Sequence, residues 1–248
     1  MATAAPRRCT GSLRQQNGMH IETLDFVAGA RAARGVAVII DVFRAFSVAC
    51  YASAQGVERI IPVGDAEEAL QLKRADPKIF AVGERYGRRL PGFDCGNSPT
   101  ELESFDLRGR RIVHTTHAGT QGLVNTAAAD LVLTGSLVNA AAICRHIATL
   151  APASVSLVRM GVAASEHSDA DDLCAELLAA RLSGRSFDES SIVPRLRRSP
   201  EAQKFFDPAA DWAPQRDFEL CTTLDRFDFV LQLAGRAGER RYLVRVPG

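Results

Sequence analysis

Residues 79–101 carry several side chains whose types suit the binding of a hard cation. The apolar run Ile79–Val82 predicts a strand that Gly83 ends, and further glycines and prolines then exclude a long helix. The loop that follows offers oxygen ligands of the kind that Mg²⁺ prefers, together with one guanidinium; these are on Glu84, Arg85, Asp94, Asn97 and Ser98. A loop of this length inside a domain is usually functional or disordered, so the alternative is a solvated surface loop.

Short apolar runs alternate with helical segments along much of the chain. Strands are predicted at Val36–Ile40, Arg59–Val63, Ile79–Val82, Arg110–Thr115, Leu131–Thr134 and Ser154–Met160, with a last one at Arg240–Val246 near an edge. Helices are predicted at about 45–54, 65–75, from 120, 138–150 and 170–182. This alternation indicates an α/β protein with a mainly parallel sheet and helices on both faces.

Polar residues follow most of these strands, and the carboxyl ends of strands are where open α/β sheets bind ligands. Asp41 and Arg44 follow the first strand, and Glu84 and Arg85 the third. The later strands are followed by Thr115, Thr116, Gly119, Thr120, Ser136, Asn139 and Asp171. Each hydroxyl or carboxylate alone is an ordinary helix N-cap. Their repetition at one edge of the sheet is what favours a binding site.

Several well-known catalytic patterns are missing. The Thr-Thr-x-x-Gly-Thr turn at 115–120 could bind an anion, but it lacks the lysine of a nucleotide-binding P-loop. Phe43 stands where an Asp-x-Asp phosphatase motif would have its second aspartate. Cys95 is followed by no Cys-x5-Arg loop, so a thiolate nucleophile is disfavoured. The histidines and the six cysteines lack zinc-like spacing.

The composition of the chain limits which partners and which cellular location are expected. A formal net charge of +1 over 248 residues gives no reason to expect nucleic acid or an anionic membrane as a partner. No apolar run is long enough for a membrane span, and scattered cysteines indicate reduced thiols in a cytoplasmic protein. Residues 1–18 are predicted to be a loose N-terminal arm. Residues 19–248 are predicted to be a single α/β domain, with a smaller C-terminal subregion from about 184 as an alternative.

Five motifs, taken in order, resemble the 2-phosphosulfolactate phosphatase family. They are Asp41-Val-Phe-Arg-Ala45, Gly83-Glu-Arg85, Gly92-Phe-Asp-Cys-Gly-Asn-Ser-Pro99, Thr115-Thr116 with Gly119-Thr120, and Gly135-Ser-x-x-Asn-Ala140. The resemblance covers about residues 36–182, with Phe227-Asp228 near the end. It implies a fold of the family's own and a Mg²⁺-dependent acid phosphatase that hydrolyses 2-phospho-3-sulfolactate, a step toward coenzyme M.

The resemblance implies roles for the candidate residues. The metal would draw on Asp41, Glu84, Asp94 and Asp171. Arg44 and Arg85 would join Asp41 and Glu84 in catalysis, and the amide, hydroxyl and glycine positions named above would bind the ester: Asn97, Ser98, Thr115, Thr116, Gly119, Thr120, Ser136 and Asn139. The chain departs from the family pattern at Phe46, Ala118 and Ala170.

Two functions are therefore expected, in order. The first is a Mg²⁺-dependent phosphatase acting on a small anionic phosphoester. The second, which the departure at Ala118 keeps open, is a non-catalytic sensor of a phosphorylated or sulfonated metabolite on the same scaffold. Neither needs nucleic acid or a membrane, and a homo-oligomer is compatible with both.

Overall fold

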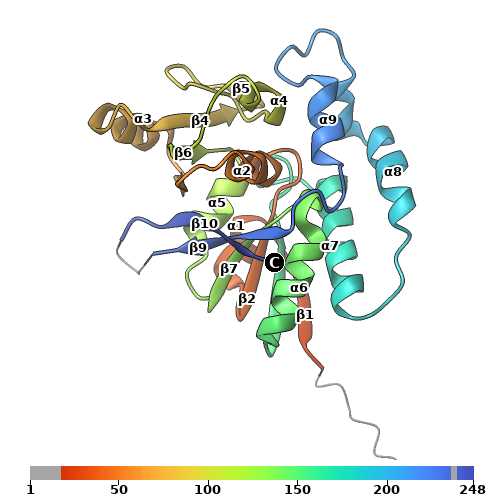
Figure 1. The fold of residues 1–248 in the computed structure, drawn as a ribbon. Coiled ribbons are helices and arrows are strands. Elements are labelled where there is room, and N and C mark those ends of the chain that lie inside the picture. Colours follow the sequence, from red (N-terminus) through yellow and green to blue (C-terminus); the bar gives the residue numbers. More distant parts are fainter. Residues whose placement is uncertain (1–17, 236–238) are drawn as a thin grey trace, which may run out of the picture.

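The computed structural model describes residues 18–235 and 239–248, so nearly all of the expected arm at 1–18 lies outside the described residues. In the described part, ten strands form one sheet in the order β1-β8-β2-β7-β9-β10-β3-β6-β4-β5 (Figure 1). The strands are β1 (His20–Asp25), β2 (Val36–Ile40), β3 (Arg59–Pro62), β4 (Phe80–Arg85), β5 (Arg88–Arg89), β6 (Arg111–Thr115), β7 (Leu131–Gly135), β8 (Ser154–Arg159), β9 (Phe229–Ala234) and β10 (Tyr242–Pro247).

Helices occupy both faces of this sheet, as the sequence predicts. The α-helices are α1 (Phe26–Ala32), α2 (Ala45–Ala54), α3 (Ala66–Ala75), α4 (Pro99–Leu102), α5 (Gly119–Asn125), α6 (Ala140–Leu150), α7 (Asp169–Leu182), α8 (Ile192–Arg198) and α9 (Gln215–Cys221). Single 3-10 turns are η1 (Leu137–Asn139), η2 (Glu189–Ser191) and η3 (Pro200–Phe205). The alternation of strands and helices thus gives the predicted α/β class.

Strand β2 shows why both faces are covered. Its side chains alternate between two apolar cores: Ala37 and Ile39 pack with α1, α2 and α5, whereas Val38 and Ile40 pack with α6 and α7. Every residue of β2 is buried. A strand buried on both faces reads as a continuous apolar run, and this is why β2 was the clearest strand in the sequence.

The sheet consists of two parallel sets joined by a hairpin. Strands β1, β8, β2 and β7 are parallel, and so are β3, β6 and β4. Between them, β9 is antiparallel to β7, β10 to β9, and β3 to β10. Because the strand direction reverses three times between the two sets, the strands of one set run opposite to those of the other. In the described strands, only Leu133–Gln232 and Leu243–Ile60 join the hairpin to its outer neighbours, and β9 and β10 run across the direction of β2 and β7 (Figure 1), so the sheet turns at the hairpin.

Three details differ from expectation. The last predicted strand is not near an edge: β10 lies in the sheet interior between β9 and β3, although most of its side chains are partly or fully exposed. Strand β4 does not end at Gly83 but continues to Arg85, because β5 pairs with its end. The sequence does not predict strands β1, β5 and β9 or helices α1 and α4.

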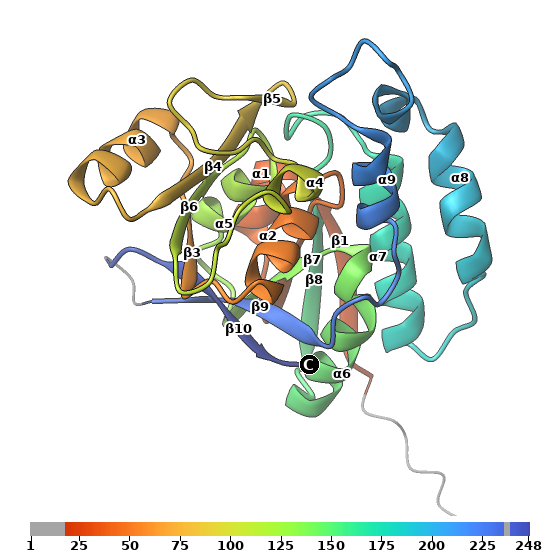
Figure 2. The ribbon, with the colours of Figure 1, turned by 45° about the horizontal axis from the view of Figure 1, so that its top comes forward.

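Residues 189–221, called the cover below, contain η2, α8, η3 and α9. Figure 2 shows α8 and α9 beside α7, on the side of the molecule away from α3. Phe205 and Phe218 of the cover belong to the same core as Val38 and Ile40 of β2. The segment therefore packs as an ordered layer, while the division of the chain into a domain and a subregion stays a prediction.

None of the helices in the described residues has the length and apolar character to cross a membrane. The expected cytoplasmic location stays a prediction.

Candidate active site

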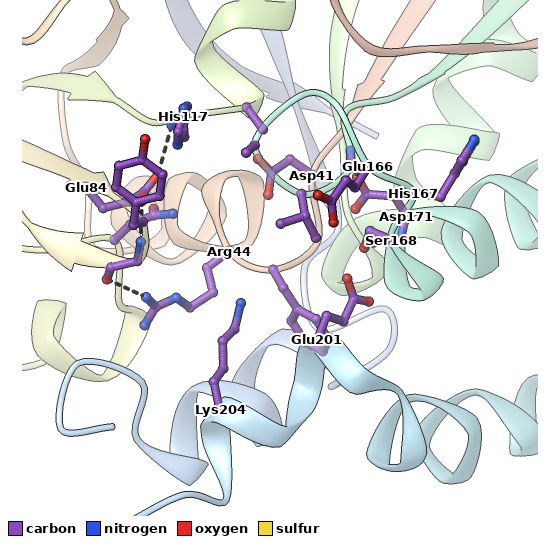
Figure 3. A pocket seen from close by; sticks show the side chains of 18 of the residues that line it. Asp41, Arg44, Glu84, His117, Glu166, His167, Ser168, Asp171, Glu201 and Lys204 are labelled. Atoms are coloured by element: carbon purple, nitrogen blue, oxygen red, sulfur yellow. Dashed lines mark hydrogen bonds between the residues drawn. The ribbon is translucent and has the colours of Figure 1, made fainter. Parts of the chain in front are cut away.

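A cavity of about 660 Å³ lies between the ends of the strands and the cover (Figure 3). Its lining comes from the carboxyl ends of both parallel sets, at Asp41 after β2, Glu84 in β4, His117 after β6 and Gly161 after β8. The turn of the sheet at the hairpin brings these ends to one place although the two sets run in opposite senses. The convergence that the sequence predicted is present, but two half-sheets create it.

Asp41 is fixed at the end of β2. Its side chain is buried, and Oδ1 accepts the N–H of Ala45 at 3.1 Å. Helix α5 begins against the same carboxylate, because Gly119 has no side chain: a Cβ there would lie 2.7 Å from Oδ2. Burial raises the pKa of Asp41 to about 6, and the nearby Glu84 adds to the effect.

Asp171 lies in the first turn of α7 and is held by two backbone groups. Oδ1 accepts the N–H of Val42 at 2.9 Å, and Oδ2 accepts the N–H of Gly161 at 2.8 Å. Burial raises the pKa of Asp171 well above its ordinary value, and the neighbouring Asp41 raises it further. These two carboxyl groups therefore oppose each other's ionisation, and a cation placed between them would relieve that repulsion.

Glu84 faces the cavity from the other parallel set. Oε1 accepts the N–H of His117 at 2.8 Å and Oε2 accepts the N–H of Gly87 at 2.7 Å. Figure 3 shows Glu84 beside His117 on one side of the cavity, with Asp41 and Asp171 on the other. Three of the four carboxylates predicted as metal ligands thus line one cavity.

The fourth predicted ligand, Asp94, lies elsewhere. It does not line the cavity, and its carboxylate instead binds Lys73 Nζ at 2.7 Å and the N–H of Ala81 at 2.8 Å. These bonds fasten the loop after β5 to α3 and β4. The geometry therefore gives Asp94 a structural role.

The donor set of the cavity fits a hard cation. Six carboxyl groups line it against two cationic side chains, those of Arg44 and Lys204. No three His, Cys, Asp or Glu side chains in the described residues are gathered closely enough to form a ready metal cage. Mg²⁺ is usually held by only one or two carboxylates, with water and substrate phosphate completing its shell. Asp41 with Asp171, or Asp41 with Glu84, meets that requirement.

The comparisons with known proteins agree with these features. The profile of the 2-phosphosulpholactate phosphatase family matches residues 22–236. The chain belongs to this family. Probable 2-phosphosulfolactate phosphatases from Caldanaerobacter subterraneus and Bacillus subtilis are each 31% identical over 79% of this chain and 86% of their own length. One from Symbiobacterium thermophilum is 42% identical over 117 residues, which is 46% of this chain and half of that relative. The predicted family and the predicted class, a phosphoric monoester hydrolase, are confirmed.

The most specific family motif, Gly92–Pro99, mainly builds the scaffold of the site. Asn97 lines the cavity, and its Oδ1 lies 3.2 Å from Nε2 of the buried His114. Ser98 caps α4 and donates its hydroxyl to Asp217 of the cover at 2.8 Å. Cys95 is a buried free thiol whose pKa is raised above its usual range by burial, which makes it a poor nucleophile.

The two arginines of the family motifs are engaged with the protein itself. Arg44 borders the cavity, but its guanidinium pairs with Asp217 at 2.5 Å and donates to the carbonyl oxygens of Trp212 and Gly87. Arg85 does not line the cavity and donates to Thr115 Oγ1 and to the carbonyl oxygen of Gly64. Both arginines thus hold loops in place.

The remaining predicted substrate-binding residues lie behind the cavity lining. Thr116 and Thr120 bond to each other across the start of α5. Ser136 shares a 2.7 Å hydrogen bond with Ser47, and Asn139 donates to the carbonyl oxygen of Phe229. They are buried and absent from the lining, as are Thr115 and Ser98. Their geometry supports the strand ends that carry Asp41 and Glu84.

Sequence reasoning missed the cavity residues that come from exposed or late segments. Tyr86 and His117 stack edge to face at 4.9 Å, and His167, Glu201, Lys204 and Trp212 line the other sides. His117 lies inside a motif that the sequence singled out, between Thr116 and Gly119, and could have been found there. Burial lowers the pKa of Lys204, and Arg44 lowers it further.

The three departures from the family pattern lie in different surroundings. Phe46 is fully buried in the core below α2, and Ala118 occupies the N-cap position of α5 without a capping side chain. Ala170 donates its N–H to Glu201 Oε1 at 2.8 Å, which ties α7 to the cover. Of the three, only Ala118 lines the cavity.

Proposed function

We propose that this protein is a Mg²⁺-dependent phosphatase of a small anionic phosphomonoester, 2-phospho-3-sulfolactate or a close analogue. The observation that carries the proposal is the buried carboxylate of Asp41 at the end of β2, beside Asp171 and facing a cavity that Glu84 also lines. Family membership supports the reaction class, and the names of the relatives support the substrate.

The surplus of carboxyl groups supports the need for a metal. An anionic ester would be repelled by six carboxyl groups that only two cationic side chains offset. Asp41 and Asp171, with Glu84 across the cavity, are the groups that would hold Mg²⁺. The bound ion would act as a Lewis acid that neutralises charge on the phosphoryl oxygens.

The protein's own groups would position the reactants. Above about pH 6 Asp41 is deprotonated, so it can orient the attacking water or accept its proton. Its position at the end of a buried strand keeps the carboxylate in one place, as such a role requires. His117 lies beside Glu84, and Asn97 also lines the cavity; both would help to orient the ester.

The test is hydrolysis of 2-phospho-3-sulfolactate and of a generic aryl phosphate, with Mg²⁺, Mn²⁺ or Zn²⁺ and with excess chelator. Oxygen ligands favour Mg²⁺ or Mn²⁺ over Zn²⁺, so chelation should abolish turnover and Mg²⁺ should restore it. Full activity in excess chelator would contradict the metal role. Tight binding of both esters without hydrolysis under any condition would instead favour the sensor.

A further inference from the structure

Lys204 differs from the other cationic side chains around the cavity. It lies in η3 of the cover, is partly buried, and points into the cavity (Figure 3). Within the described part of the chain its ammonium forms no ion pair or hydrogen bond, and its recorded contact is with the ring of Phe205, 5.1 Å from the centroid. A lysine ammonium has three donors, and here all three are available.

The neighbours of Lys204 are already occupied. The guanidinium of Arg44 is held by Asp217 and two backbone carbonyl groups. Glu201, in the same 3-10 turn, is turned toward α7, where Oε1 accepts the N–H of Ala170. Of the cationic side chains in the described lining, Lys204 is therefore the one whose N–H donors are free to bind a ligand.

Lys204 enters the cavity from the cover, and its charge interacts across the cavity with Asp41 and Glu84. Asp41 and Asp171 come from the sheet and α7, whereas Lys204 enters from the cover on the opposite side (Figure 3). A phosphoryl group held near the carboxylates with a metal leaves the rest of the ester directed toward the cover. A second anionic group on that ester could not lie against the carboxylates, and an ammonium is its natural partner.

We propose that Lys204 binds the second anionic group of the substrate, a carboxylate or sulfonate, and so selects phosphoesters that carry one. This inference rests on the proposed function for the orientation of the ester. It makes Lys204 a determinant of specificity, while the reacting phosphoryl group stays at the strand ends.

The experiment compares wild type with Lys204→Met, Lys204→Arg and the control Lys78→Met, which alters an exposed lysine outside the cavity. Each variant is assayed with phosphoglycolate and 2-phospho-3-sulfolactate, which carry further anionic groups, and with phenyl phosphate, which carries none. Loss of a charged hydrogen bond should lower kcat/KM for the first two by about tenfold or more relative to phenyl phosphate. Lys204→Arg should restore part of the preference, and Lys78→Met should leave it unchanged.

A binding measurement separates this inference from the proposed function. Calorimetry with 3-sulfolactate, which has no phosphoryl group to hydrolyse, should show affinity that Lys204→Met weakens by about tenfold or more. If the wild type hydrolyses no ester but Lys204→Met still weakens binding of 3-sulfolactate, the proposed function fails while the anion-binding role of Lys204 stands. The inference is overturned if Lys204→Met binds 3-sulfolactate as tightly as the wild type does. It is also overturned if the substitution lowers kcat/KM for all three esters by the same factor. Thermal melting confirms that each variant is folded.

Discussion

The two sides of the cavity hold their charged groups in different ways. At the strand ends, Asp41, Glu84 and Asp171 each accept backbone N–H groups from segments that the sheet fixes in place. On the cover, Lys204 has no such partner in the described residues, and the cover itself is anchored through Asp217. The comparison teaches that one side is built for fixed geometry, which chemistry needs, and the other for adaptable contact, which suits selection among ligands.

The largest expected effect comes from the fixed side. Asp41→Asn keeps an oxygen that can accept the Ala45 N–H but removes the charge. Because a bound metal contributes several kcal/mol to transition-state stabilisation, turnover should fall by about a thousandfold or more and Mg²⁺ affinity should collapse. The melting temperature of the metal-free protein should not fall, because the substitution also removes the cost of an ionised carboxylate at a buried site. Turnover and melting are to be measured on the same sample.

Asp65→Asn is the matched control, since Asp65 caps α3 through the Glu68 N–H and does not line the cavity. It should leave both quantities unchanged. Near-normal turnover of Asp41→Asn would show that Asp41 only caps a helix. The strand ends would then no longer be the side of the cavity that carries the chemistry.

A substitution on the cover should act on stability first. Asp217→Asn breaks a fully buried ion pair with Arg44 and weakens the bonds to Ser98 and Thr100. Removing one partner of a buried pair costs about 3–5 kcal/mol. Urea unfolding should show this loss, and Arg44→Met combined with Asp217→Asn should cost less than the sum of the two single variants. Strict additivity would mean that the pair does not anchor the cover.

The carboxylates at the strand ends should make the metal-free protein sensitive to pH. Asp41 has its pKa raised from 3.8 to about 6, so the folded state holds its proton more tightly than the unfolded state. Its contribution to stability is therefore full below about pH 3.8 and is lost as the pH rises through 6. Between pH 5 and pH 7.5 the loss from Asp41 is about 1–2 kcal/mol, and Asp171 acts in the same direction.

Added Mg²⁺ should offset that loss, because it competes with protons for the same carboxylates. Melting temperatures with and without Mg²⁺ should accordingly differ more at pH 7.5 than at pH 5. An equal shift at both pH values would place the metal away from Asp41 and Asp171.

The smallest effect is expected at a residue that belongs to neither charged side. Cys95 is buried and its thiol is held protonated, so Cys95→Ser should keep turnover within about tenfold of wild type. Initial rates with an aryl phosphate would check this. A loss beyond about a thousandfold in a folded variant would point to a covalent cysteine mechanism.

The fixed side was largely predictable from the sequence, and the cover was not. Asp41 follows a continuous apolar run that only a buried strand explains, so its place at a strand end could be inferred from neighbours in the chain. Arg44 and Asp217 are separated by 173 positions, and nothing local indicates that one neutralises the other. Lys204 likewise lies in a short 3-10 turn without periodicity. Such pairings depend on the tertiary fold.

The strands show the same limit. β1 is hard to predict because it is a partly exposed edge strand with no clean alternation, and the interior position of β10 depends on pairing with the distant strands β9 and β3. The register of the hairpin between two half-sheets is a property of the assembled sheet. β9, by contrast, follows Asp228 as a plain apolar run and could have been recognised.

The hairpin also has a consequence for the order in which the molecule can assemble. β9 and β10 are the last described strands in the sequence, yet they lie between β7 and β3 in the sheet. During synthesis on the ribosome, β1 to β8 all emerge before the pair that joins the two half-sheets. Contacts between such distant parts of a chain slow folding. The nascent chain thus carries both halves of its cavity for some time before the sheet that aligns them is complete.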